Sequence, residues 1–137
     1  MKEDCIFCKI AKGEIHSATV YEDSHFTVIL DVNPATKGHC LIIPKEHFDN
    51  IYDLDGETAG KLFALATCIA RAMRDALKCD GLNLVQNNGE IAGQTVNHFH
   101  LHLIPRYEGD GLNLNGPQQE ISAEQLEEIR QSIKKSI

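Results

Sequence analysis

The chain has 137 residues, 42% of them hydrophobic and 24% charged, and its 20 acidic and 13 basic residues give a formal charge of −7. This composition indicates one soluble globular domain and argues against binding of nucleic acid through a basic surface. No apolar run is long enough for a signal peptide or a membrane span, so a cytoplasmic protein without a membrane partner is expected. Five cysteines, an odd number, argue against a disulfide framework.

The first half of the chain predicts a short helix followed by three strands. Residues 1–12 mix apolar and charged positions and allow one or two helical turns. The segments "ATVYED" (18–23) and "HFTVIL" (25–30) flank a polar stretch and predict a hairpin. "HCLIIP" (39–44) is apolar on both faces apart from its histidine, which is typical of a central strand.

The second half predicts a long helix, two strands and a terminal helix. Asp55 is a candidate N-cap for a helix over residues 57–77. Strands are predicted over residues 82–87 and 96–105, and a final helix over residues 123–135. Together the elements indicate an α+β fold with an antiparallel sheet of about five strands. The apolar stripe of the long helix contains Leu62, Phe63, Ala66, Ile69, Ala70, Met73 and Leu77.

The segment "VNHFHLHLIP" (96–105) places three histidines at alternate positions. Because side chains alternate between the faces of a strand, His98, His100 and His102 share one face and the apolar residues between them share the other. The row spans about 13 Å, too far for a single metal ion but suited to an elongated polar ligand. Two chemistries remain open: pairs of imidazoles that ligate a metal, or a neutral imidazole nucleophile whose neighbours hold an anion.

Cys5 and Cys8 have the C-x-x-C spacing of a metal site. Two histidines would complete a tetrahedral Cys₂His₂ set, while two unpaired thiols on a short helix are the simpler alternative. The other three cysteines show no such spacing.

Four motifs together resemble the histidine triad (HIT) superfamily. "HFHLHLI" is preceded by "AGQTVN", "KGHCLIIPKEH" lies upstream, and "CIFCKI" lies near the start. The likeness is greatest to the bacterial members of the Hint branch, which are nucleoside phosphoramidase-like proteins. It covers residues 4–106, the expected HIT domain, and leaves 107–137 as a C-terminal extension that carries the terminal helix within the same globular unit. It also implies a homodimer that joins its sheets through the long helix and an edge strand.

The resemblance implies a nucleotide hydrolase without a catalytic metal. His100 would attack the α-phosphorus of an AMP-like purine nucleotide, form a covalent nucleotidyl-histidine, and release AMP from a phosphoramidate after hydrolysis. One alternative is a dinucleoside polyphosphate hydrolase with the same nucleophile. Two others are a nucleotide-binding regulatory module with little turnover, and a sensor or store of transition metals built on the histidine row.

The resemblance also assigns roles to individual residues. His102 would donate to a phosphate oxygen, His39 would support His100, and Thr95 would contact the phosphate or the leaving group. Asp31 would accept hydrogen bonds from the ribose. Asn87 would lie near the phosphate or the ribose, and Phe7, Ile10, Ile29 and Val32 would surround the base. From the residues themselves, the backbone N–H groups of Gly93, Gln94 and Thr95 could form a small anion cradle beside His102.

A structural zinc site is implied as well. In bacterial relatives the C-x-x-C pair is completed by the histidine of "PKEH" and by the first histidine of the triad. The implied ligands are Cys5, Cys8, His47 and His98.

Overall fold

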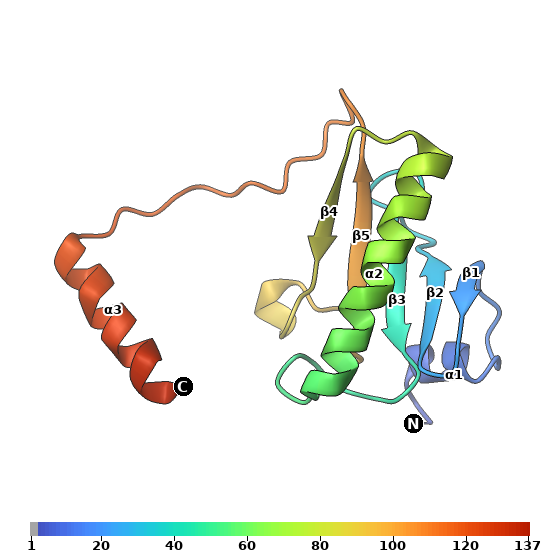
Figure 1. The fold of residues 1–137 in the computed structure, drawn as a ribbon, viewed down its shortest axis with the longest axis horizontal. Coiled ribbons are helices and arrows are strands. Elements are labelled where there is room, and N and C mark those ends of the chain that lie inside the picture. The colour runs from blue at the N-terminus through green and yellow to red at the C-terminus, as the bar shows by residue number, and fades with distance from the viewer. Residues whose placement is uncertain (1–2) are drawn as a thin grey trace.

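The computed structural model describes residues 3–137, which form one five-stranded sheet, three α-helices and a short 3-10 helix (Figure 1). The predicted α+β class, with one long helix and one C-terminal helix, is confirmed. The elements in chain order are α1 (Ile6–Ala11), β1 (Thr19–Glu22), β2 (Phe26–Leu30), β3 (Cys40–Pro44), α2 (Gly56–Leu77), β4 (Gly81–Val85), η1 (Glu90–Ala92), β5 (Leu101–Arg106) and α3 (Ala123–Ser136).

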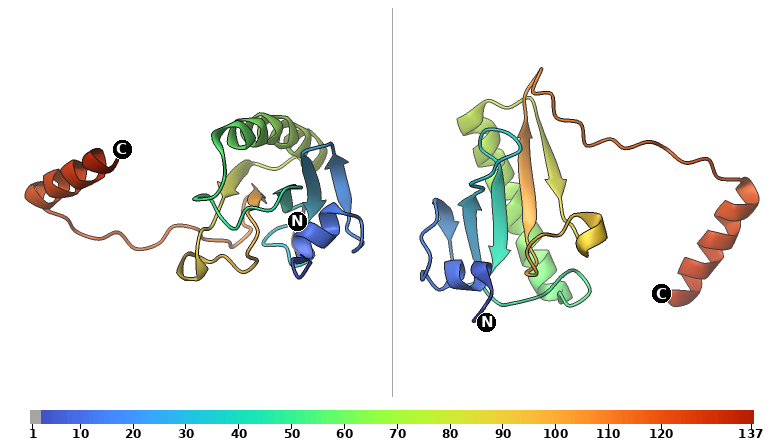
Figure 2. Two further views of the ribbon diagram at one scale, coloured as in Figure 1. Left: turned by 90° about the horizontal axis from the view of Figure 1, so that it is seen from below. Right: turned by 180° about the vertical axis from the view of Figure 1, so that it is seen from behind.

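The sheet is antiparallel throughout, with the strand order β1-β2-β3-β5-β4. Helix α2 lies across one face of the sheet, and α1 lies against the other (Figures 1 and 2). Alternation along β2 and β3 therefore sends Val28 and Ile42 into a core beneath α2, and Ile29 and Leu41 into a smaller cluster with Phe7 of α1.

Helix α2 begins after Asp55, whose side chain accepts the N–H of Thr58 as an N-cap, as predicted. Its buried stripe consists of Leu62, Ala66, Ile69 and Met73. Phe63 was also expected in this stripe, but its side chain is 55% exposed. It lies one residue, or about 100°, beyond Leu62 on the helix, so its side chain points away from the sheet.

The histidine segment starts its strand later than predicted, at Leu101 rather than at residue 96. The backbone bends at residues 96–98, and the N–H of Phe99 donates to the carbonyl of Phe48 at 2.6 Å instead of joining a neighbouring strand. The expected alternation nevertheless holds. Phe99, Leu101 and Leu103 belong to the core beneath α2, and the histidines lie on the opposite side.

The C-terminal extension follows β5, and its place within the same globular unit stays a prediction. A long irregular segment after β5 carries α3 away from the sheet, on the side of β4 (Figures 1 and 2). Every residue from 113 to 137 is exposed. None of the helices in residues 3–137 combines the length and the apolar character that crossing a membrane requires.

Candidate active site

The imidazoles gather on the face of the sheet that carries α1. Strand β5 places His102 opposite Leu41 of β3, and His39 comes two residues before Leu41, just ahead of that strand. The rings of His100 and His102 lie 4.9 Å apart, and Nε2 of His39 lies 2.9 Å from Nδ1 of His102. The register of β3 against β5 thus brings a fourth histidine to the row, as the resemblance implied.

The hydrogen bonds of His100 fix its tautomer. Its Nδ1 lies 2.7 Å from the backbone carbonyl of His98, which can only accept, so Nδ1 carries the proton. The lone pair of the neutral ring is therefore on Nε2. Burial lowers the pKa of His100, so the ring is neutral at neutral pH. His100 is 6% exposed and lines a cavity of about 440 Å³, which gives the ring a route to a ligand.

His39 and His102 form an ordered chain of hydrogen bonds. Nδ1 of His39 accepts the N–H of Ala35 at 3.0 Å, so the proton of neutral His39 is on Nε2 and is donated to Nδ1 of His102. Neutral His102 consequently carries its own proton on Nε2, and its ring lines the same cavity as His100. Burial lowers the pKa of His102 to about 4, which keeps the ring neutral near pH 7.

Asp31 completes a group of three possible metal ligands with His39 and His102. Its carboxylate lies 3.7 Å from Nε2 of His39. A metal bound there through Nε2 of His39 would require both nitrogens of that ring to lack a proton, because Nδ1 already accepts from Ala35. The hydrogen-bond pattern therefore fits two neutral rings with fixed tautomers and does not fit a metal site.

The cavity in front of His100 has an apolar wall supplied mainly by α1 and β2. The ring of Phe7 contacts that of His100 edge to face, with 4.9 Å between the centroids. All the residues expected around the base and ribose line this cavity: Phe7, Ile10, Ile29, Asp31 and Val32. Further lining residues that the sequence reasoning missed are Ile6, Ile15, Leu41 and Val96.

The loop after η1 differs from the expected anion cradle. The N–H groups of Gly93 and Gln94 donate to the carbonyls of Glu90 and Gly89, so they are not available to a phosphate. The side-chain amide of Gln94 is likewise engaged, because it donates to the carbonyls of Asp49 and Val96 and accepts the N–H of Gly89. Gln94 therefore braces the loop.

Thr95 is the member of this loop that remains open to a ligand. Within residues 3–137 its N–H and its hydroxyl form no hydrogen bond, and its side chain is exposed. Thr95 lines both the cavity of His100 and a second cavity of about 530 Å³. That second cavity, which no sequence pattern predicted, is lined by Asn50, Gly89, Glu90, Gln94, Thr95 and Asn97.

Gly93 and Asn87 meet at the base of the loop. Gly93 has a φ of +96°, which favours glycine, and a Cβ there would lie 3.4 Å from the amide nitrogen of Asn87. Asn87 is half-buried. The structure thus places both residues near the loop that carries Thr95, and their contact with a nucleotide stays a prediction.

The four predicted metal ligands converge at the first histidine of the row, His98. The reacting atoms of Cys5, Cys8, His47 and His98 all lie within 4.8 Å of one another. Nδ1 of His98 lies 3.1 Å from Nδ1 of His47 and 3.3 Å from Sγ of Cys5. Nδ1 of His47 lies 3.3 Å from Sγ of Cys8.

The outer contacts of the two histidines leave both Nδ1 atoms without a proton. Nε2 of His98 donates to the carbonyl of Pro44 at 2.9 Å, and Nε2 of His47 donates to Asp49 at 2.7 Å. Two lone pairs then face each other with two sulfurs beside them, an arrangement that a cation stabilises. Two nitrogens bound to one tetrahedral zinc lie about 3.3 Å apart, close to the spacing found here.

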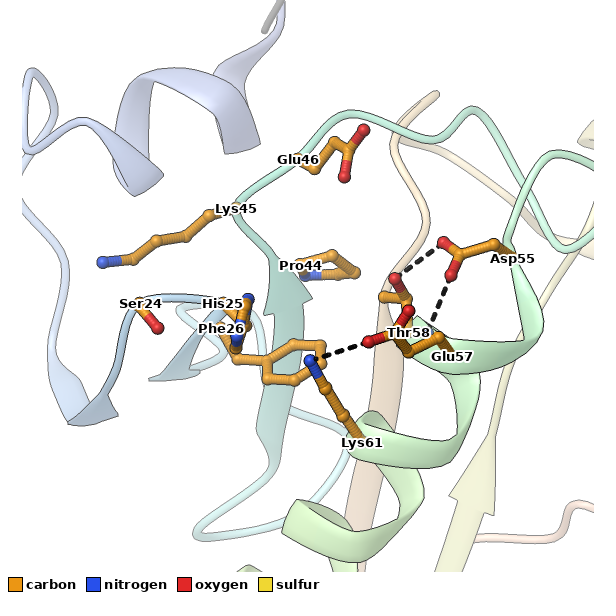
Figure 3. Close-up of a pocket in the computed structure, with 10 residues that line it drawn as sticks. All are labelled: Ser24, His25, Phe26, Pro44, Lys45, Glu46, Asp55, Glu57, Thr58 and Lys61. Carbon is orange, nitrogen blue, oxygen red and sulfur yellow. Dashed lines mark hydrogen bonds and ion pairs between the residues drawn. The ribbon is translucent and has the colours of Figure 1, made fainter.

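Another cavity, of about 470 Å³, lies between β2, the end of β3 and the start of α2 (Figure 3). Its charged groups are of both signs. The carboxylate of Asp55 caps Thr58, and Glu57 pairs with Lys61 at 3.3 Å. Because none of the row of imidazoles lines it, this cavity is separate from the candidate active site.

The comparison with protein families agrees with the geometry. The model of the HIT domain matches residues 12–109. The chain belongs to the HIT domain family. The hit protein of Bacillus subtilis is 47% identical over 98% of this chain and 95% of its own length. The adenosine 5'-monophosphoramidase of Saccharomyces cerevisiae is 41% identical over 94% of this chain and 80% of its own.

Solved structures of HIT proteins superimpose closely. A protein from Streptococcus mutans has a TM-score of 0.95 at 45% identity, over 99% of this chain and 87% of that one. A HIT family member from Bacillus subtilis has a TM-score of 0.92 at 47% identity, over 98% of both chains. A zinc-bound histidine triad family protein from Mycobacterium smegmatis has a TM-score of 0.77 at 39% identity, over 98% of both chains.

Proposed function

We propose that this HIT protein is a hydrolase that releases AMP, or a related purine nucleoside monophosphate, from a phosphoramidate or a similar conjugate. The observation that carries the proposal is the pair of fixed tautomers at the cavity. The Nε2 lone pair of His100 and the Nε2–H of His102 belong to neighbouring rings that line one cavity. The relative from Saccharomyces cerevisiae named as an adenosine 5'-monophosphoramidase supports the choice of substrate.

The first chemical step is the attack of His100 on the α-phosphorus. The new bond joins Nε2 to phosphorus, the phosphorus–nitrogen bond breaks, and its electron pair leaves with the amine, which takes a proton from solvent. His102 donates its Nε2–H to a non-bridging oxygen and stabilises the charge that develops there. Thr95, which lines both cavities, would contact the phosphate or the departing group.

The second step is hydrolysis of the nucleotidyl-histidine. Water attacks phosphorus and loses a proton to solvent, the bond to Nε2 breaks, and the nucleoside monophosphate is released with His100 neutral again. The carbonyl of His98 holds the Nδ1–H of His100 through both steps, so the ring keeps its orientation. His39 supports the sequence by holding the tautomer of His102.

The nucleoside would occupy the apolar end of the cavity. The base packs against α1 near Phe7, and a ribose hydroxyl donates to Asp31. One oxygen of Asp31 already accepts the N–H of Asn33, which orients the carboxylate. No metal takes part in these steps.

A structural zinc ion would be held by Cys5, Cys8, His47 and His98, and a zinc-bound relative from Mycobacterium smegmatis supports this assignment. Bound zinc would supply a tetrahedral crosslink between α1 and the loop that precedes β5. We also propose a homodimer formed through α2 and an edge strand of the sheet, as the family resemblance implies.

Two other functions use the same cavity, namely hydrolysis of dinucleoside polyphosphates and nucleotide binding with little turnover. Initial rates with adenosine 5'-phosphoramidate and with diadenosine polyphosphates separate the first from our proposal. We expect a higher kcat/KM for the phosphoramidate. A preference for the dinucleotide, or AMP binding with no turnover of either substrate, would overturn it. His100→Ala should abolish turnover of the phosphoramidate, whereas the matched control His25→Ala, at an exposed histidine outside the site, should keep it.

A further inference from the structure

Helix α1 carries side chains of two different sites. Cys5, which caps the helix, and Cys8, in its first turn, are two of the four predicted zinc ligands. Three further side chains of the helix line the cavity in front of His100, namely Ile6, Phe7 and Ile10. The zinc site and the proposed nucleotide site therefore share one helix of six residues.

The polar contacts that fasten α1 to the rest of the described chain pass through the two cysteines. The backbone hydrogen bonds of residues 5–14 stay within that segment. Sγ of Cys5 lies 3.3 Å from Nδ1 of His98. Sγ of Cys8 lies 3.3 Å from Nδ1 of His47. A helix of this length is marginal on its own, so its position depends on these contacts and on apolar packing.

The apolar packing of α1 includes Phe7, which is buried in a cluster with Leu41 and Ile43 of β3. The centroid of its ring lies 5.9 Å from that of His98 and 4.9 Å from that of His100, and both contacts are edge to face. One aromatic ring thus contacts a predicted zinc ligand and the proposed nucleophile. A shift of α1 would move this ring and the cavity wall together.

The metal cluster is unfavourable without a cation. The Nδ1 lone pairs of His47 and His98 face each other at 3.1 Å and repel. In the absence of an ion we expect the two rings to separate, so that Cys5 and Cys8 lose the partners that hold them. The start of α1 is then held by apolar packing alone.

A small cavity gives an ion a route to the cluster. This cavity, of about 300 Å³, is lined by two of the predicted ligands, Cys5 and His47, and by the exposed Asn97. It shares Ile6 and Thr95 with the cavity in front of His100. Because the ion can reach its ligands without unfolding of the chain, occupancy of the cluster can follow the concentration of free zinc.

We propose that zinc at the cluster and a nucleotide in the cavity increase each other's affinity through α1. This inference rests on the proposed function, because it takes the base to lie against α1. With zinc bound, Cys5 and Cys8 stay tied to the histidines, and Ile6 and Phe7 stay in the wall that the base contacts. By linkage, the nucleotide raises the affinity for zinc by the same factor. Substrate binding by this chain therefore follows the supply of zinc.

Calorimetric titration of the zinc-loaded and the metal-stripped chain tests the coupling. The ligands are AMP and, as the matched control without a base, ribose 5-phosphate. We expect loss of zinc to raise the Kd of AMP about tenfold and that of ribose 5-phosphate by less than about twofold. Equal Kd values of AMP for both forms would overturn the coupling and leave the proposed function standing. No binding of AMP to either form would overturn both.

The reciprocal measurement uses the zinc-loaded chain, so it does not require the stripped form to stay folded. In competition with a chromophoric chelator, saturating AMP should lower the Kd of zinc about tenfold, and ribose 5-phosphate at equal occupancy should not. An equal effect of both ligands contradicts the proposal, because the coupling would then act through overall stability and not through the wall that contacts the base.

Two variants show whether the coupling passes through α1. The double variant Ile6→Ala and Ile10→Ala shortens side chains of the α1 wall and should reduce the factor by which AMP tightens zinc binding. Asp31→Asn, in the same cavity but outside α1, should weaken AMP binding and keep that factor at saturating AMP. A factor that the α1 variant leaves unchanged, or that Asp31→Asn reduces equally, would contradict the proposal.

Discussion

His98 connects the cysteine cluster to the proposed nucleophile. Its backbone carbonyl accepts the Nδ1–H of His100 at 2.7 Å, while its own ring nitrogen lies 3.3 Å from Sγ of Cys5. One residue thus holds the tautomer of His100 with its main chain and closes the cluster with its side chain. Phe7 of α1 strengthens the connection, because its ring contacts the rings of both histidines.

Removing the two thiols of the cluster should release bound metal and destabilise the fold. We expect one zinc per chain in the wild type by elemental analysis and none after Cys5→Ser and Cys8→Ser. The Tm should fall by about 5 °C or more, because a zinc-bound native state is stabilised relative to the unfolded chain. Cys68→Ser, at an exposed position of α2, should keep the zinc and the Tm. Unchanged zinc content in the double variant would refute the assignment of the ligands.

Replacing Asp31 with Asn should weaken recognition of the ribose. We expect KM for an AMP–amine conjugate to rise about tenfold, the loss typical of a hydrogen bond to a charged group. A 2',3'-dideoxy analogue of the substrate lacks the ribose hydroxyls and should show nearly the same KM with both proteins. If the variant affects both substrates equally, Asp31 acts through His39 and not on the ribose.

His39 should act as a positioning residue. His39→Ala removes the donor to Nδ1 of His102 and should lower kcat about 100-fold with little change in KM. The reason is that His102 donates to a phosphate oxygen whose negative charge grows in the transition state. His39→Gln retains an N–H donor and should recover part of the loss. A rise in KM with kcat preserved would show instead that His39 serves substrate binding.

The low pKa of His102 should make stability depend on pH. Burial lowers this pKa from 6.5 to about 4, so between these values the unfolded chain binds more protons here than the folded chain. The contribution of neutral His102 to the free energy of unfolding is therefore fully present above pH 6.5 and is lost as the pH falls toward 4. Urea unfolding at pH 7 and pH 4.5 should show a loss that is smaller in His102→Gln by on the order of 2 kcal/mol.

The exposed His25 supplies the control for this titration. His25→Gln should lose as much stability as the wild type between the two pH values. Equal losses in the wild type and in His102→Gln would contradict the assignment of a neutral, buried His102.

The sequence predicted the features that depend on local pattern and on the resemblance. Alternation alone placed Phe99 and Leu101 in the core and the histidines on the other side, although the strand itself begins only at Leu101. The hydrogen bond between His39 and His102 depends on the pairing of two strands far apart in the chain. The resemblance implied that His39 would support His100, and the contact with His102 that the structure shows was not expected.

Other features of the site had no local signal. The side chain of Gln94 braces the loop through three backbone groups, which depends on how residues 89–96 fold. The cavity beside Glu90 forms between this loop and Asn50, which is remote in sequence. The position of α3 could not be predicted from its sequence either, because an amphipathic stripe predicts a helix but does not say where in the molecule that helix lies.

Mass spectrometry of the intact protein after rapid quenching with an AMP–amine substrate tests the central claim most directly. The account predicts a transient adduct with the mass of one adenylyl group, located on His100 after digestion and absent from His100→Ala. Thr95→Ser, which keeps the hydroxyl, should still form it. Turnover by the wild type without any adduct, or an adduct on another residue, would contradict the account.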